Sequence, residues 1–245
     1  IAPIAVIALT IGALRVGGAL MHQADLPDNF STRSQGNFEV FYPEERGDDA
    51  DQIVRDGAAF LRAAPSAWGD RLGGLEPPPG KVRLTLFRDG AELTRFASDT
   101  LKEDLSQNGG YFDTATLEIA LVLSKRRDDN SLGIHHELAH MLIQRGGGRF
   151  GSKMPPWLSE GLAVWMETAN PAKPDGPAPV SMWVKMVCVA TGTPTLNQLT
   201  ATDSGAFTSS GNEVAYAYSN LLVHFLLEQR ASDFWVYARR TRSDE

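Results

Sequence analysis

The stretch that decides the fold is His136-Glu137-Leu138-Ala139-His140, which is followed by a second one, Pro156-Trp157-Leu158-Ser159-Glu160-Gly161. Around the first stretch apolar residues recur at helical spacing, which predicts a helix over residues 130–145. A proline pair opens the second stretch and predicts a helix over residues 156–168, because proline is favoured in the first turn. Three residues near the start of the first helix are candidate N-caps: Asp129, Asn130 and Ser131.

The spacing within the first stretch brings functional side chains together. At about 3.6 residues per turn, His140 lies about 40° around from His136, so both imidazoles leave the same face. Glu137 lies about 100° from His136, which leaves its carboxylate beside the two rings. A catalytic zinc takes three protein ligands and keeps a fourth position open for water. Glu160, in the first turn of the second helix, can point back as the third ligand. The sequence therefore predicts a Zn²⁺ site formed by His136, His140 and Glu160.

The H-E-x-x-H pattern occurs in several classes of zinc hydrolase, and the spacing excludes two of them. A metzincin continues with a glycine and a third histidine, but Ile143 and Gly146 occupy those positions here. A deformylase-like site draws a cysteine ligand from upstream of the motif. The single cysteine, Cys188, lies far downstream.

The two stretches, extended by Leu162 and Ala163, resemble the gluzincin metallopeptidases, and most of all the peptidase MA-like group of bacterial proteins. The resemblance extends to residues 110–113 and 216–226 and covers roughly residues 80–230. It implies a thermolysin-like architecture, with an edge strand above the site, the motif helix and the Glu160 helix. One position departs from the pattern. Thermolysin-like enzymes often place a carboxylate four residues after the glutamate ligand to orient a histidine, and here that residue is Val164.

The motif and the resemblance together predict a zinc-dependent metallopeptidase that hydrolyses peptide bonds. Glu137 would act as general base and take a proton from the metal-bound water. The resemblance favours Tyr216 as the donor to the oxyanion. Tyr216, Asn220 and His224 lie along one arc of about 80° of a predicted helix. Asn220, His224 and Glu167 are candidates for contacts that orient the ligands.

The expected substrate is an extended peptide or protein. A strand over residues 117–122 would be an edge strand that pairs with it through main-chain hydrogen bonds. No aminopeptidase-like recognition motif is visible, which favours an endopeptidase. Two alternatives stay open. The fold could be a catalytically weak or inactive zinc- or peptide-binding module, or the two histidines could be hydrogen-bonded in a purely structural domain.

The remaining sequence sets the class and the organisation. Strands are predicted at 38–42, 82–87 and 117–122, and further helices at 49–68, 90–97, 181–189, 213–229 and 232–241. This order indicates an α+β protein with a small mixed sheet packed on a mainly helical C-terminal half. The catalytic domain would span 37–245, divided into an α/β lobe (37–125) and a helical lobe with the zinc site (126–245).

The N-terminal residues and the net charge lead to further expectations. Residues 1–21 are apolar and resemble a signal peptide or membrane anchor, which predicts an exported protein that associates with the membrane if the segment is kept. Residues 22–36 are polar and rich in turn formers, so they are predicted as a linker. The net charge of −7 argues against nucleic acid as a partner, since a phosphate binder needs a basic face.

Overall fold

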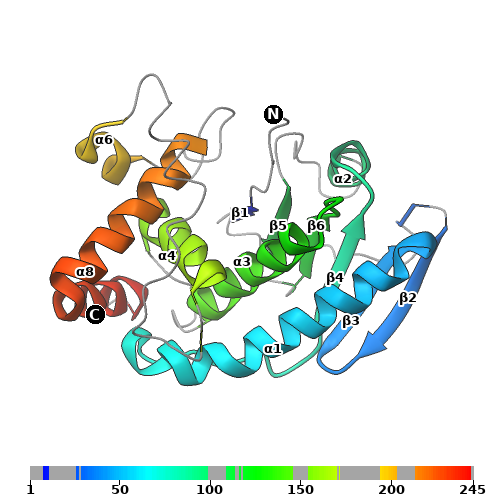
Figure 1. Cartoon of the computed structure of the whole chain (residues 1–245), viewed down its shortest axis with the longest axis horizontal. Helices are drawn as coiled ribbons and strands as arrows, with labels where there is room; N and C mark the ends of the chain where they lie inside the picture. Colours follow the sequence, from blue (N-terminus) through cyan, green and yellow to red (C-terminus); the bar gives the residue numbers. More distant parts are fainter. Residues whose placement is uncertain are drawn as a thin grey trace. The chain divides into compact units, whose positions relative to one another are not determined.

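A computed structural model shows a mixed α+β protein with a small mixed sheet, as the sequence predicts (Figure 1). The chain divides into two units, residues 1–59 with 78–137 and residues 60–77 with 138–245. Helices α1 (Gly47–Leu72) and α3 (Arg127–Arg145) contribute residues to both units. The structure describes residues 8–10, 26–27, 29–98, 109–113, 116, 118–145, 154–169, 171, 194–202 and 213–243.

The first unit is built on a six-stranded sheet of order β1-β5-β6-β4-β3-β2. Its central strands β3, β4 and β6 run parallel, while β2 is antiparallel to β3 and β5 is antiparallel to β6. The short strand β1 pairs parallel to β5. The three predicted strands are confirmed as β3, β4 and β6. The bounds are β1 Ala8–Thr10, β2 Phe30–Gln35, β3 Phe38–Pro43, β4 Val82–Phe87, β5 Gly110–Asp113 and β6 Glu118–Val122.

One arginine fixes the register of the parallel strands. Arg83 on β4 lies between Glu39 on β3 and Glu118 on β6, which are its Cα partners in the two ladders. Its guanidinium pairs with both carboxylates, at 3.1 Å from Glu39 and 2.7 Å from Glu118. Because a shift by one residue would turn these side chains to opposite faces of the sheet, the charges oppose any slip.

Two expectations about the sheet are wrong. Residues 30–35, predicted as part of the linker, form β2, whose half-buried and exposed side chains suit a strand that pairs on one side. Residues 117–122 were expected at the edge of the sheet. Instead β6 lies between β4 and β5, because the short segment 110–113 folds back against it as a strand. In the described part of the chain the edges are β1 and β2.

Of the apolar segment 1–21, the structure describes residues 8–10 alone, so the predicted signal peptide or anchor lies almost wholly outside the described residues. Among the helices that the structure describes, none has the length and apolar character needed to span a bilayer.

Helices of the first unit pack on this sheet, and α1 and α3 continue into the second. They are α1 Gly47–Leu72, α2 Gly90–Phe96 and α3 Arg127–Arg145. The predicted N-caps of α3 are wrong, since the helix begins at Arg127 and the candidates lie inside it. Two of them hold the preceding loop instead. Asn130 accepts a hydrogen bond from the Ser124 main chain at 2.7 Å, and Asp129 accepts one from the Ser124 hydroxyl at 3.0 Å.

The second unit is helical. It contains the ends of α1 and α3 together with α4 Pro156–Thr168, α6 Leu196–Ala201 and α8 Glu213–Ser243. The prediction for α4 is confirmed in both bounds. Helix α8 joins the two predicted helices across a kink at Arg230, where φ is −148° and ψ is 41°. The helix predicted over 181–189 lies outside the described residues.

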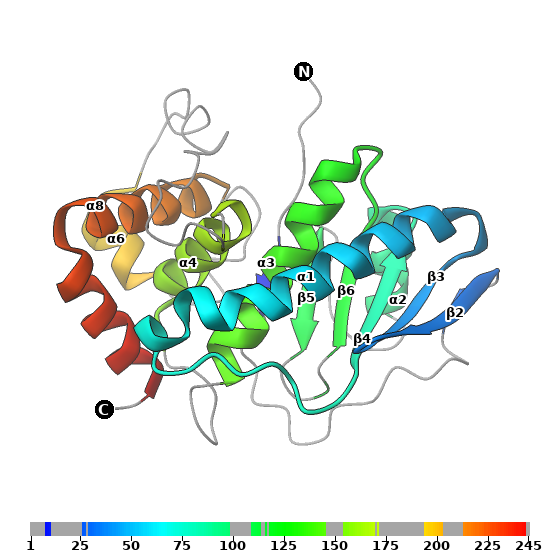
Figure 2. The same ribbon diagram turned by 60° about the horizontal axis from the view of Figure 1, so that its bottom comes forward.

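Helices α4 and α8 pack against each other in the second unit (Figure 2), and a glycine of α4 permits their close approach. A Cβ atom on Gly161 would lie 2.6 Å from the main-chain oxygen of Ser219 and 2.8 Å from a methyl group of Val223. The two helices therefore approach to a distance that only glycine permits. Trp165 of α4 adds to this contact, since its ring centroid lies 5.8 Å from that of Trp235 on α8. The ring centroid of Trp68 on α1 lies 5.4 Å from that of Trp165.

A buried guanidinium closes the second unit. Arg242, in the last turn of α8, is almost completely buried and donates to three main-chain carbonyls, those of Ile143 at 2.6 Å, Leu142 at 3.2 Å and Leu72. These carbonyls belong to the last turns of α3 and α1, where helices leave acceptors unpaired and carry partial negative charge. Burial lowers the pKa of Arg242 to about 10, so the group is charged at neutral pH.

Candidate metal centre

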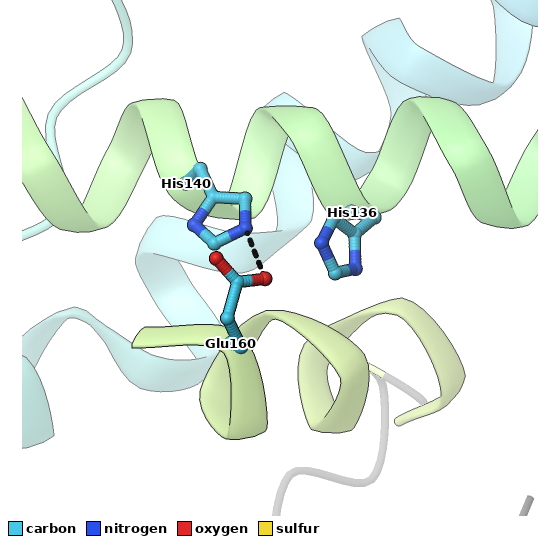
Figure 3. Close-up of side chains that lie close together, drawn as sticks. All are labelled: His136, His140 and Glu160. Atoms are coloured by element: carbon cyan, nitrogen blue, oxygen red, sulfur yellow. Dashed lines mark hydrogen bonds and ion pairs between the residues drawn. The ribbon is translucent and has the colours of Figure 1, made fainter. Parts of the chain in front are cut away.

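Two helices present the three predicted ligands. His136 and His140 lie one turn apart on α3, and Glu160 lies on α4 (Figure 3). Glu160 is the fifth residue of α4, which begins at Pro156 as predicted, so it lies in the second turn and not in the first as expected. All three side chains are buried. Figure 3 shows both imidazoles directed towards the carboxylate.

The ligand atoms of these three residues lie within 4.8 Å of one another. Zinc bonds to nitrogen and oxygen of about 2.0–2.2 Å in tetrahedral geometry place the ligand atoms about 3.4 Å apart. Nε2 of His140 and Oε2 of Glu160 lie 3.1 Å apart, near this spacing. Two imidazoles and one carboxylate, converging at this spacing, fit the ligand set of a catalytic zinc. Among the His, Cys, Asp and Glu residues that the structure describes, this is the group able to hold a metal.

The second ring nitrogen of His140 also has a partner. Its Nδ1 atom lies 3.3 Å from the hydroxyl oxygen of Ser159, the residue before Glu160. Sequence reasoning missed this contact. The signal was nevertheless present, because a hydroxyl stands next to a ligand on the same helix and about 100° around from it.

Glu137 is completely buried and lies beside the first unit's sheet. Its Oε1 atom would be 3.4 Å from a Cβ atom placed on Gly110 of β5. The same Cβ atom would be 2.6 Å from the main-chain oxygen of Ala120. Strand β5 can therefore lie between β6 and the Glu137 carboxylate only because residue 110 is a glycine. The sequence did not reveal this requirement.

Three further candidates lie on α8. Tyr216, Asn220 and His224 are spaced four apart, so they lie along one arc of the helix, and all three are buried. Among the residues that the structure describes, neither side-chain polar atom of Asn220 has a hydrogen-bond partner, and neither does Nε2 of His224. Burial lowers the pKa of His224 below its ordinary value, an effect that the charge of Glu228 partly opposes.

The remaining candidate, Glu167, is buried near the end of α4. Neither it nor His224 belongs to the three-residue group that could hold a metal. Val164, one turn before the end of α4, is buried as well, and its apolar side chain cannot bond to a ligand histidine.

Comparison of the sequence with models of known protein families and with curated proteins gives no match.

Proposed function

We propose that this chain is a zinc-dependent metallopeptidase of the gluzincin type, most similar to the peptidase MA-like group, and that it cleaves peptide bonds as an endopeptidase. The observation that carries the proposal is the convergence of His136, His140 and Glu160 from two helices, within 4.8 Å and buried. The order of the ligands, two on a first helix and one on the next, supports a thermolysin-like arrangement.

Each side chain has a defined role in this proposal. His136, His140 and Glu160 would hold Zn²⁺. The bound ion would polarise the scissile carbonyl and lower the pKa of water towards about 7. Glu137 follows His136 on the same helix without being a ligand, so its carboxylate can take the proton of the attacking water and return it to the leaving amine.

Three polar side chains on α8 would contact the oxyanion and the substrate, those of Tyr216, Asn220 and His224. Tyr216 carries a hydroxyl that can donate to a developing negative charge. Asn220 and His224 have buried polar atoms that find no partner within the described part of the chain, and each such atom costs roughly 1–3 kcal/mol when it stays dry. This cost supports their pairing with water or with a polar group of a bound peptide. Glu167 stays a candidate for orienting the ligands from the far end of α4.

The substrate would be a peptide or protein, and the apolar segment 1–21 supports export and contact with a membrane. The role of edge strand at residues 117–122 is not proposed again, since β6 is internal.

The test compares the wild type with Glu137→Gln, Glu160→Gln and an exposed control, Glu44→Gln. Zinc content is measured by elemental analysis, zinc affinity by competition with a chelator, and hydrolysis with a peptide library. Glu137→Gln should keep its zinc and lose about 10²–10⁴-fold in kcat. Glu160→Gln should lose zinc affinity, and Glu44→Gln should match the wild type.

Three results would contradict the proposal in different ways. Undiminished turnover in Glu137→Gln would remove the general base from the mechanism. A wild type that binds zinc but cleaves nothing would favour the alternative, an inactive zinc- or peptide-binding module. A wild type that binds no zinc would leave the histidines with a structural role.

A further inference from the structure

His140 is held at both ring nitrogens by consecutive residues of α4. Nε2 lies 3.1 Å from Oε2 of Glu160, and Nδ1 lies 3.3 Å from Oγ of Ser159. Glu160 is buried, and Ser159 is half-buried. The ring is therefore fixed in orientation as well as in position.

The two contacts constrain where the ring carries its proton. A neutral imidazole has one nitrogen that donates and one that accepts. An ionised carboxylate accepts only. For a neutral ring facing an ionised carboxylate without a metal, Nε2 of His140 donates to Glu160 and Nδ1 is left as an acceptor. The Ser159 hydroxyl can then donate to Nδ1.

Metal binding reverses this assignment. When Nε2 gives its lone pair to a metal, the proton of the neutral ring stands on Nδ1 and needs an acceptor. The oxygen of Ser159 can accept it without any movement of the backbone, because a hydroxyl rotates and serves as donor or acceptor. A carboxylate in this place would suit the loaded site alone, and an alkyl group would suit neither state.

We infer that Ser159 is a positioning residue of the metal centre, whose hydroxyl holds His140 in one orientation both before and after the metal binds. This inference rests on the proposed function for its second half, since it needs a metal at Nε2. Val164, one turn further along α4, is apolar and cannot replace it. The metal site thus has an orienting contact that reverses its direction.

The experiment uses the full chain with Ser159→Ala, which removes the hydroxyl, and Ser159→Thr, which keeps it. Ser66→Ala is the matched control, a serine that is helical, exposed and also in the second unit. Zinc affinity is measured by chelator competition, and thermal unfolding is followed in parallel. Ser159→Ala should bind zinc about 10–100-fold more weakly, as is usual when an outer hydrogen bond to a ligand histidine is lost. Ser159→Thr should stay within about threefold of the wild type, because the donor and acceptor are retained.

A second measurement does not depend on zinc. Nitrogen-15 NMR of the metal-free wild type should show the His140 proton on Nε2 and a hydrogen-bonded acceptor at Nδ1, and this bond should disappear in Ser159→Ala. After zinc is added to the wild type, the proton should be found on Nδ1.

The outcomes separate the two proposals. A Ser159→Ala variant with a lowered Tm but unchanged zinc affinity would make the serine merely structural and overturn the inference. A proton on Nδ1 in the metal-free wild type would overturn the reversal. If the wild type bound no zinc while the metal-free spectra came out as expected, the proposed function would fail and the contact between Ser159 and His140 would stand.

Discussion

Replacing Gly161 by alanine tests whether the close approach of α4 and α8 sets the position of Glu160. The new Cβ atom would lie 2.6 Å from the main-chain oxygen of Ser219 and 2.8 Å from Val223. The oxygen belongs to a helix backbone and cannot rotate away, so the helices must separate. Overpacking of this kind costs about 1–3 kcal/mol.

An opposing term must be subtracted. Alanine is favoured over glycine inside a helix by about 1 kcal/mol. Because the contact is with rigid backbone, the cost should fall in the upper part of its range, which leaves a net loss of about 1–2 kcal/mol. For a chain of this size such a loss lowers Tm by about 2–8 °C. Glu160 precedes Gly161 directly, so zinc affinity should fall as well.

Gly133→Ala is the matched control. This glycine lies inside α3, and its added Cβ atom would make an ordinary contact of 3.7 Å with Leu121. The same substitution should therefore stabilise the protein by about 0.5–1 kcal/mol through helix propensity alone. Unfolding in urea, monitored by circular dichroism, measures both variants. If Gly161→Ala proved as stable as Gly133→Ala, the packing argument for α4 and α8 would be refuted.

Three other substitutions test separate features. Gly110→Ala would press β5 against the neighbouring strand and against Glu137, so it should destabilise the protein by about 1–3 kcal/mol. It should also lower the rate of hydrolysis more than the zinc affinity. A thermal stability equal to that of the wild type would contradict this prediction. Tyr216→Phe should lower kcat by about 10²-fold with KM little changed, and an unchanged kcat in steady-state assays would remove the hydroxyl from the mechanism. Arg242→Met should lower the free energy of unfolding by about 2–4 kcal/mol, because three buried carbonyls lose a charged donor, whereas the exposed Arg240→Met should stay within about 0.5 kcal/mol in the same denaturation experiment.

Helical periodicity and the motif spacing were sufficient to predict the elements that carry the ligands. Apolar residues around His136 and the proline pair before Trp157 are local signals, and the helices they predict appear as α3 and α4. Helix geometry predicted that His136 and His140 share one face. The short connection between the two helices predicted that Glu160 lies near them.

The elements that were missed depend on distant partners. Residues 110–113 have a glycine start and only four residues, and they become a strand because β6 offers a ladder. Residues 30–35 are mostly polar, and they become a strand because they pair with β3. Arg242 stands in a polar, strongly basic segment that resembles a surface, and its burial depends on carbonyls of Leu72 and Leu142 far away in the chain. No local pattern contains such information.

The contacts of Arg242 also have a consequence for the order in which the protein is made. The arginine is separated by 99 residues from Ile143 and by 170 residues from Leu72. At a synthesis rate of roughly 5–20 residues per second, the end of the motif helix waits about 5–20 s for its donor, and the end of α1 waits about 10–35 s. The second unit can therefore close only after almost all of its sequence has been translated, and α3 emerges from the ribosome long before the group that completes it.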